Sequence, residues 1–429
     1  MIPVAAKRPP LHERGPGFAL LIVLIAINLR AFLTSTSPLI GEIRAATGLG
    51  FQGASMLTML PMLAMGAMSL LGIALGGRLG ARAGGLCGLA AIAAACGSRM
   101  FAEGASLLLA SAALAGVGVG LVQALMPAVV KRAYPRHTGV AMGLYSAALM
   151  GGGGLGAVGA PWMAHAGGDW HAGLAVWALP AVLAMLAWAC TRADAADASG
   201  SADASGAMRS GWRACFRNRR AWTLALYFGL INGGYTSLVA WLPQFYAVQG
   251  WDNAHTGSML ALMTTAQLVS ALVVPVLARG RRDLRPWLLA MLGLQIAGFA
   301  ALALHAPLPA MVVGVLGLGL GGAFALCMAL ALDHLPHPEQ AGALAAFMQG
   351  VGFMVAALSP LLTSWVREHA GGFDAAWAYL GLVAMLLLPL TWRFDPRAYA
   401  RLVGGLFGGQ DTPRDSRLPR AAGVLPVVD

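Results

Sequence analysis

The sequence predicts an all-α membrane protein with twelve transmembrane helices in two six-helix bundles. Three observations carry this prediction. The 429 residues are 58% hydrophobic and only 10% charged, whereas soluble domains carry about 25% charged residues. Twelve apolar segments approach or exceed the ~20 residues that cross a bilayer as a helix. They form two sets of six, separated by a polar stretch from Arg192 to Arg220.

The predicted spans follow one another with short polar connections. The first set covers residues 18–39, 52–76, 84–102, 105–130, 139–164 and 170–191, and the second covers 222–247, 256–278, 286–304, 308–332, 341–366 and 374–392. This order gives a tail (1–17), a first bundle (18–191), a linker (192–220), a second bundle (221–393) and a final tail (394–429). The first span follows no clear small-residue cleavage site, so we expect it to be retained.

The linker differs in composition from the spans on either side. It begins with the small and acidic run ADAADASGSADASGAMRS and ends with four arginines, Arg213, Arg217, Arg219 and Arg220. Such a stretch has little apolar surface to bury and is typical of a flexible connection. We therefore expect it to separate the two bundles.

The basic residues predict the orientation. If the N-terminus is cytoplasmic, 24 of the 28 lysines and arginines fall in cytoplasmic segments, and only Arg44 and Arg367 fall outside. This bias predicts that both termini and the linker are cytoplasmic. It also accounts for the net charge of +11 without a nucleic-acid partner, because basic loops are attracted to anionic lipid headgroups.

The two halves show signs of an internal repeat. Gly116, Gly118 and Gly120 in the fourth span match a second glycine triplet, 317, 319 and 321, at an offset of 201 residues. Basic loops follow the second and the eighth span. Many transporters are built from such repeats, with the binding site at their interface.

Several stretches resemble one branch of the major facilitator superfamily, the branch that includes cyanate and 2-nitroimidazole transporters. They are Asn28-Leu29-Arg30 followed by TSTSPL, then GVGVGLVQALMPAVVKRAYP, GLYSAALMGGG, WHAGLAVWALPA, LYFGLINGGYTSLVAWLPQFY and GLGLGGAFALCMAL. The resemblance covers residues 18–393 and implies the major facilitator fold.

One loop departs from the family pattern, which commonly has an aspartate after the second span. Here Gly77, Arg78, Gly80 and Arg82 keep the glycine and basic positions, but the acid is missing. We expect Arg78 and Arg82 to contact lipid headgroups or the end of another helix instead.

Arg30 is the strongest candidate for a functional residue. It lies about halfway along the first predicted span, where a charged side chain costs at least ~2.5 kcal/mol. The spans hold no acidic residue at that depth. We therefore expect Arg30 to face a cavity and hold an anionic or strongly polar solute; the alternative is a buried pair or a hydrogen-bonded brace.

Arg99 is the second basic residue within a span, and two interpretations stay open. It lies towards the outer end of the third span. It either contacts the solute, or it extends to the membrane surface or pairs with Glu103 four residues later.

Neutral polar side chains supply the remaining candidates for binding a solute. Asn28, Asn232, Gln267 and Gln349 lie near the middle of their spans, and Tyr235 follows the Asn232-Gly233-Gly234 break. Polar groups in a bilayer also form hydrogen bonds between helices with no role in binding, so this alternative applies to each of them. The glycine run 151–154 lacks the residues of a phosphate loop, which favours close helix packing.

The expected function is secondary transport by alternating access across a bacterial inner membrane. The resemblance implies a small anionic or polar solute, either a cyanate-like anion or a small nitrogen heterocycle. A multidrug-type efflux carrier is the alternative. A membrane-embedded enzyme or a sensor is less favoured, because the spans hold no cluster of His, Asp and Glu and no large soluble domain is present. The five cysteines lack metal-like spacing, so we expect no metal site. We also expect that the protein needs no cofactor and works as a monomer.

Overall fold

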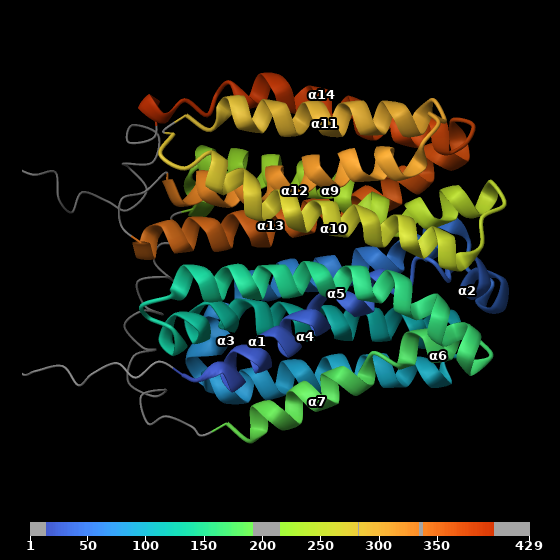
Figure 1. Ribbon diagram of the computed structural model, residues 1–429, viewed down its shortest axis with the longest axis horizontal. Helices are drawn as coiled ribbons and strands as arrows, with labels where there is room; N and C mark the ends of the chain where they lie inside the picture. Colours follow the sequence, from blue (N-terminus) through green and yellow to red (C-terminus); the bar gives the residue numbers. More distant parts are fainter. Residues whose placement is uncertain (1–13, 192–214, 282, 334–337, 399–429) are drawn as a thin grey trace, which may run out of the picture.

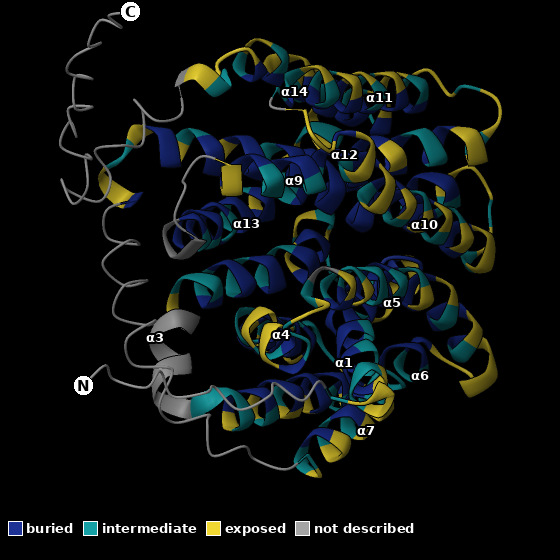
Figure 2. Ribbon diagram, turned by 60° about the vertical axis from the view of Figure 1, so that its left-hand side comes forward, coloured by how far each residue is buried: buried dark blue, intermediate teal, exposed yellow. Residues whose placement is uncertain are grey.

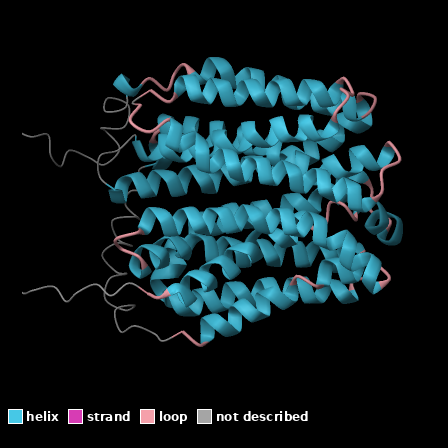
Figure 3. Ribbon diagram, viewed as in Figure 1, coloured by secondary structure: helices cyan, strands magenta, loops and turns pink. Residues whose placement is uncertain are grey.

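The computed structural model describes residues 14–191, 215–281, 283–333 and 338–398. These residues form helices and short loops, and none of them forms a strand (Figure 3). The predicted N-terminal tail, linker and C-terminal tail fall largely outside the described residues.

The helices form two halves that lie side by side (Figure 1). The N-half consists of α1 (Pro16–Thr34), α2 (Ile40–Thr47), α3 (Phe51–Ser98), the one-turn helix η1 (Arg99–Phe101), α4 (Ala105–Ala133), α5 (Thr138–Gly167), α6 (Trp170–Ala175) and α7 (Ala178–Ala189). The C-half consists of α9 (Arg219–Val248), α10 (Asn253–Leu277), α11 (Arg285–Ala303), α12 (Pro309–Asp333), α13 (Pro338–His369), α14 (Phe373–Thr391) and the one-turn helix η3 (Pro396–Ala398).

We call the end where α1 begins and α14 ends the terminal face, and the end where α2 and α6 lie the opposite face (Figure 1). Within the described residues, eleven segments are long and apolar enough to cross a membrane. The twelfth predicted span, 222–247, lies in the 30-residue α9 (Arg219–Val248), which is not one of these eleven; its middle contains Asn232, two glycines and Tyr235.

One predicted boundary needs correction. The first span was expected to reach residue 39, but α1 ends at Thr34 and the chain turns before α2. The connection expected between the second and third spans is confirmed, because α3 is broken at Gly80, whose φ of 72° and ψ of 161° are not helical and separate two helical segments. Glycine tolerates this left-handed φ because it has no Cβ.

Arg82 confirms the expectation that a basic residue after this break contacts another helix end. Its Nη2 donates to the carbonyl oxygen of Ala189, the last residue of α7, at 2.7 Å. The Trp188 indole N–H donates a hydrogen bond to the Arg82 carbonyl oxygen at 3.1 Å. The side chain of Arg78 falls outside the described residues.

The glycine triplets confirm the internal repeat. A Cβ at Gly116 or Gly120 would collide with the first half of α3, and a Cβ at Gly118 would collide with the second half, at Gly88. In the C-half the outer two glycines, 317 and 321, pack in the same way on α10, and Gly319 packs on α11. Small residues let helix backbones approach closely in a membrane, and both halves use them at matching positions.

Figure 2 shows exposed residues mainly on the outer sides of the helices and buried residues between the helices. Leu179, Leu183 and Leu186 on α7 are 65%, 59% and 54% exposed, and Val276 on α10 is 68% exposed. In a membrane protein such residues face the lipid tails.

Four hydrogen bonds join the halves towards the opposite face, and we call them the opposite-face seal. They run from Ser37 Oγ to Val239 O, from Ser55 Oγ to Pro360 O (3.2 Å), from Gln52 Nε2 to Glu368 Oε2 (3.2 Å) and from Asn253 Nδ2 to Glu42 Oε1 (2.5 Å). The helix pairs α3 with α13 and α5 with α10 carry most of the contact between the halves.

A cation–π stack lies beside the seal. The guanidinium carbons of Arg44 and Arg367 lie 3.5 and 3.6 Å from the ring centroid of Phe51. Arg44 and Phe51 belong to the N-half, whereas Arg367 belongs to the C-half. The Phe51 ring therefore joins the two halves.

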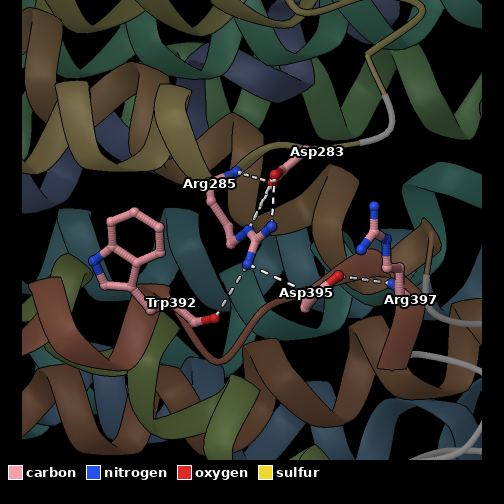
Figure 4. Close-up of polar contacts among 5 residues, drawn as sticks. All are labelled: Asp283, Arg285, Trp392, Asp395 and Arg397. Atoms are coloured by element: carbon pink, nitrogen blue, oxygen red, sulfur yellow. Dashed lines mark hydrogen bonds and ion pairs between the residues drawn. The ribbon is translucent and has the colours of Figure 1, made fainter.

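At the terminal face an ion-pair cluster links the start of α11 with the segment after α14 (Figure 4). Arg285 Nη2 lies 2.8 Å from Asp283 Oδ2, and Arg285 Nη1 lies 3.6 Å from Asp395 Oδ2. Hydrogen bonds from Arg285 hold the pKa of the Asp283 carboxyl below its usual value.

Candidate functional site

Arg30 lies on α1, one turn before the helix ends at Thr34. Its side chain is buried, with 5% of the residue exposed, and its guanidinium carbon lies 4.8 Å from the ring centroid of Tyr235 on α9. Arg30 belongs to the N-half and Tyr235 to the C-half, so the pair brings the two halves together around one positive charge.

The Arg30 guanidinium lacks a hydrogen-bond or ion-pair partner among the described residues. Its Nε is fully enclosed without an acceptor, whereas the two terminal nitrogens are not fully enclosed. A buried charge that lacks a partner is costly, and the cation–π contact with the Tyr235 ring stabilises it by only ~0.5–2 kcal/mol. The guanidinium can therefore still donate hydrogen bonds to an acceptor.

Helices α5 and α10 complete the surroundings of Arg30. A Cβ at Gly153 on α5 would lie 3.7 Å from the Arg30 Cβ and 3.8 Å from Thr264 Cγ2 on α10. Gly153 thus leaves room between the two side chains, while a Cβ at the neighbouring Gly152 would collide with the α1 backbone at Ile27. The prediction that the glycine run serves close helix packing is confirmed.

Tyr145 on α5 also lies close enough to Arg30 to interact with its charge. Neither the Tyr145 hydroxyl nor the Tyr235 hydroxyl has a hydrogen-bond partner within the described part of the chain, and neither oxygen is fully enclosed. Each of these two hydroxyls is therefore able to donate a hydrogen bond to an acceptor near Arg30. Hydrogen bonds to an ionised acceptor are about twice as strong as neutral ones.

Sequence reasoning missed Tyr145, because its place along the fifth span suggests a position nearer the cytoplasm than Arg30. The signal that points to it is GLYSAALMGGG, where the tyrosine precedes the glycine run by two helical turns. Thr264 was also missed; its hydroxyl donates to the carbonyl of Ala261 on its own helix at 2.9 Å.

Two predicted site residues on α1 and α9 form hydrogen bonds within their own halves. Asn28 Nδ2 donates to the carbonyl oxygens of Leu24 (2.7 Å) and Pro180 (3.2 Å), which joins α1 to α7. Asn232 Nδ2 donates to the Phe228 carbonyl one turn earlier on α9 at 2.8 Å.

The two predicted glutamines differ in whether their amides have a hydrogen-bond partner. The Gln349 amide contacts the sulfur of Met328 at 3.1 Å, which joins α13 to α12. Gln267 is 4% exposed, and its backbone packs against Gly317 and Gly321 on α12. Its amide has no hydrogen-bond partner among the described residues.

Arg99 lies at the opposite face, in η1, and is held by the interior of the N-half. Its Nε donates to Ser111 Oγ at 3.1 Å and its Nη1 to the Phe32 carbonyl at 3.2 Å. The residue is 2% exposed, so it does not extend to the membrane surface. Glu103 is exposed and forms no ion pair with it among the described residues. These contacts match a brace between α1 and α4.

The family follows from comparison with known proteins. The sequence profile of the Major Facilitator Superfamily matches residues 18–351, the stretch that contains Arg30, Tyr145 and Tyr235. The chain belongs to the Major Facilitator Superfamily. It is a multi-pass membrane transporter with a small-molecule substrate, and not an enzyme.

Two curated relatives are similar over most of the chain. The chain is 44% identical to the cyanate transport protein CynX of Escherichia coli (strain K12) over 384 residues, which cover 89% of this chain and 98% of that protein. It is 26% identical to the 2-nitroimidazole transporter of the same organism over 371 residues, which cover 85% of this chain and 92% of the relative. Both relatives lie in the branch that the sequence motifs resemble, so the predicted family is confirmed.

Solved structures confirm the fold. The D-xylose-proton symporter superposes with a TM-score of 0.71 at 16% identity, over 89% of this chain and 98% of that chain. The nucleoside transporter NupG superposes with a TM-score of 0.70 at 11% identity, over 88% of this chain and 98% of that chain. At these identities the likeness concerns the fold alone.

Proposed function

We propose that this transporter carries a small anion of the cyanate class, bound at Arg30 between the two halves. The observation that carries the proposal is the buried guanidinium with an enclosed Nε and two neighbouring tyrosine hydroxyls. An anion supplies the acceptor that these donors lack. The 44% identity to a cyanate transport protein supports the same class of solute.

Arg30 and Tyr235 carry this proposal among the residues singled out in the sequence, and Tyr145 joins them. Gln267 is kept as a lining residue, because its amide lacks a protein partner among the described residues. The other four, Asn28, Arg99, Asn232 and Gln349, use their polar groups within one half.

A small nitrogen heterocycle is the second candidate, because the chain is also 26% identical to a 2-nitroimidazole transporter. A flat nitro group presents acceptor oxygens to a guanidinium, and an azole ring can stack on a tyrosine. Both candidates use the same donors, so direct competition between them is expected.

We also propose an orientation and an oligomeric state for the transporter. The terminal face is assigned to the cytoplasm, because 24 of the 28 basic residues lie in the segments expected there. The transporter works as a monomer in a bacterial inner membrane, since one chain supplies both halves of the site.

Flux measurement with purified protein in liposomes tests the proposal. Labelled cyanate uptake is expected to depend on the protein and to fall at least about tenfold with Arg30→Ala, because a hydrogen bond to a charged group contributes roughly 1.5–3 kcal/mol. Arg30→Lys is expected to keep part of the flux if charge alone matters. Arg82→Ala is the matched control, since this arginine bonds to a helix end at the terminal face. Normal flux with a correctly folded Arg30→Ala protein contradicts the site.

A further inference from the structure

The charge at Arg30 also bears on how the transporter returns after it releases its solute. All seventeen acidic residues lie in tails, linker, loops, the short α2 or the ends of long helices. Within the long helices each one is among the first two or last two residues; these are Asp333, Glu339, Glu368 and Asp374. The sequence therefore places no carboxylate at the depth of Arg30.

Alternating access takes the central site through a state in which both faces are closed. On one side that closure is present here, as the opposite-face seal and the Phe51 stack. When the other face closes as well, the terminal nitrogens of Arg30 lose water. Arginine carries a positive charge in proteins, so an anion is needed to balance it in the closed site.

We propose that the protein is an obligatory anion exchanger, in which the halves change orientation rapidly only while an anion occupies Arg30. This inference rests on the proposed function. A bound monovalent anion cancels the guanidinium charge and accepts its hydrogen bonds, which removes the penalty of closing both faces on an isolated ion. An empty site keeps that penalty, so the return step needs a second anion.

In an exchanger, the concentration gradients of the two anions drive transport. One monovalent anion moves inward for each one that moves outward, so the cycle carries no net charge and consumes no proton. A proton-coupled carrier with a titrating carboxylate beside the site would need an acid inside a span, and the acids lie at helix ends instead. The partner anion belongs to the class that Arg30 and the two tyrosines bind, namely small inorganic monovalent anions.

A counterflow assay with the native chain measures whether uptake of one anion requires release of another. Liposomes containing the full-length protein are loaded either with unlabelled cyanate or with an impermeant organic anion, and the initial uptake of labelled cyanate is compared. We expect uptake at least tenfold faster into the cyanate-loaded liposomes. A membrane potential imposed with potassium and valinomycin is expected to leave that exchange rate unchanged.

The outcomes separate the two proposals. Equal protein-dependent uptake into both kinds of liposome overturns exchange and leaves the proposed transport of cyanate in place. Uptake that no added protein accelerates, in either kind of liposome, overturns both.

A conformational readout avoids dependence on flux. Ser37→Cys is introduced into a variant without the native cysteines, because Ser37 bonds to Val239 in the seal and becomes accessible when the halves part. Cyanate is expected to speed thiol labelling at least fivefold, and adding Arg30→Gln is expected to give fast labelling without any anion. Fast labelling of Arg30-containing protein without an anion contradicts the inference.

Discussion

Arg30 and Arg99 are two buried arginines with different surroundings. Arg99 donates to the Ser111 hydroxyl and the Phe32 carbonyl, so its charge is stabilised inside the N-half. Arg30 lies against the Tyr235 ring, and its guanidinium has no hydrogen-bond or ion-pair partner among the described residues. The sequence treats both as arginines within spans, and only the contacts distinguish a brace from a binding group.

Replacing Arg99 is expected to affect stability rather than affinity. Arg99→Ala removes two hydrogen bonds to a charged group, each contributing ~1.5–3 kcal/mol, although the Phe32 carbonyl still accepts from Ser35 Oγ at 3.0 Å. Thermal unfolding in detergent should move to lower temperature, while cyanate affinity of the remaining folded protein stays within about twofold. A large loss of affinity at unchanged stability would instead place Arg99 in the binding site.

Tyr145→Phe tests the tyrosine that the sequence did not single out. Loss of one hydrogen bond, about 0.5–1.5 kcal/mol, should weaken cyanate binding about two- to tenfold without lowering stability. Tyr227→Phe is the matched control, because its hydroxyl bonds to Thr391 inside the C-half at 2.8 Å. The control is expected to lower stability and leave binding unchanged; the reverse pattern contradicts the assignment.

The spans as elements were largely predictable, because apolar length is set by the bilayer and is visible in the sequence. The details at their ends were not. The second and third spans are separated by a single break at Gly80, and the turn after Thr34 shortens α1. Both features depend on backbone angles and on packing against neighbouring helices, which hydrophobicity alone does not encode.

The glycines of α12 offer a test of helix packing within one element. A Cβ at Gly321 would collide with the backbone of Gln267 on α10, whereas a Cβ at Gly314 would meet nothing within 4 Å. Gly321→Ala should therefore destabilise the protein by roughly 1–3 kcal/mol through overpacking. Gly314→Ala should be neutral or slightly stabilising, as alanine favours the helix. Unfolding midpoints in detergent compare the two, and equal midpoints contradict the packing argument.

For the whole molecule, the seal predicts that transport requires the two halves to part at the opposite face. Glu42→Cys and Asn253→Cys replace a side-chain pair that bridges the halves at 2.5 Å. In a variant without the native cysteines, a cleavable bifunctional thiol cross-linker should reduce cyanate flux at least about tenfold, and cleavage of its spacer should restore it.

A cysteine pair within one half provides the control for this experiment. His305 Nε2 and Asp374 Oδ1 lie 2.7 Å apart, both in the C-half. Cross-linking His305→Cys to Asp374→Cys should leave flux unchanged, since rigid movement of the half does not separate them. Inhibition by this second cross-link would contradict rigid movement of the halves.

The candidate site was only partly predictable. Arg30 was a candidate because a charge in a span is rare, and Tyr235 because it follows a glycine break; the structure brings these two candidates into contact. The roles of Asn28 and Asn232 were not, since position along a span gives depth but not the direction in which a side chain points. That direction is set by helix rotation and tilt, and these follow from contacts such as those of Gly152 and Gly153 with α1.

The opposite-face seal has a consequence for the environment in which the transporter works. Its described contacts are hydrogen bonds from hydroxyl and amide groups, together with a ring between two arginines. None of these contacts is an ion pair between a basic and an acidic side chain. The charges of Arg44, Arg367 and Glu368 nevertheless interact across the two halves, because Arg44 repels Arg367 and attracts Glu368. Dissolved salt screens such interactions over about 10 Å at 0.1 M. Closure of this face is therefore expected to respond to the ionic strength of the surroundings.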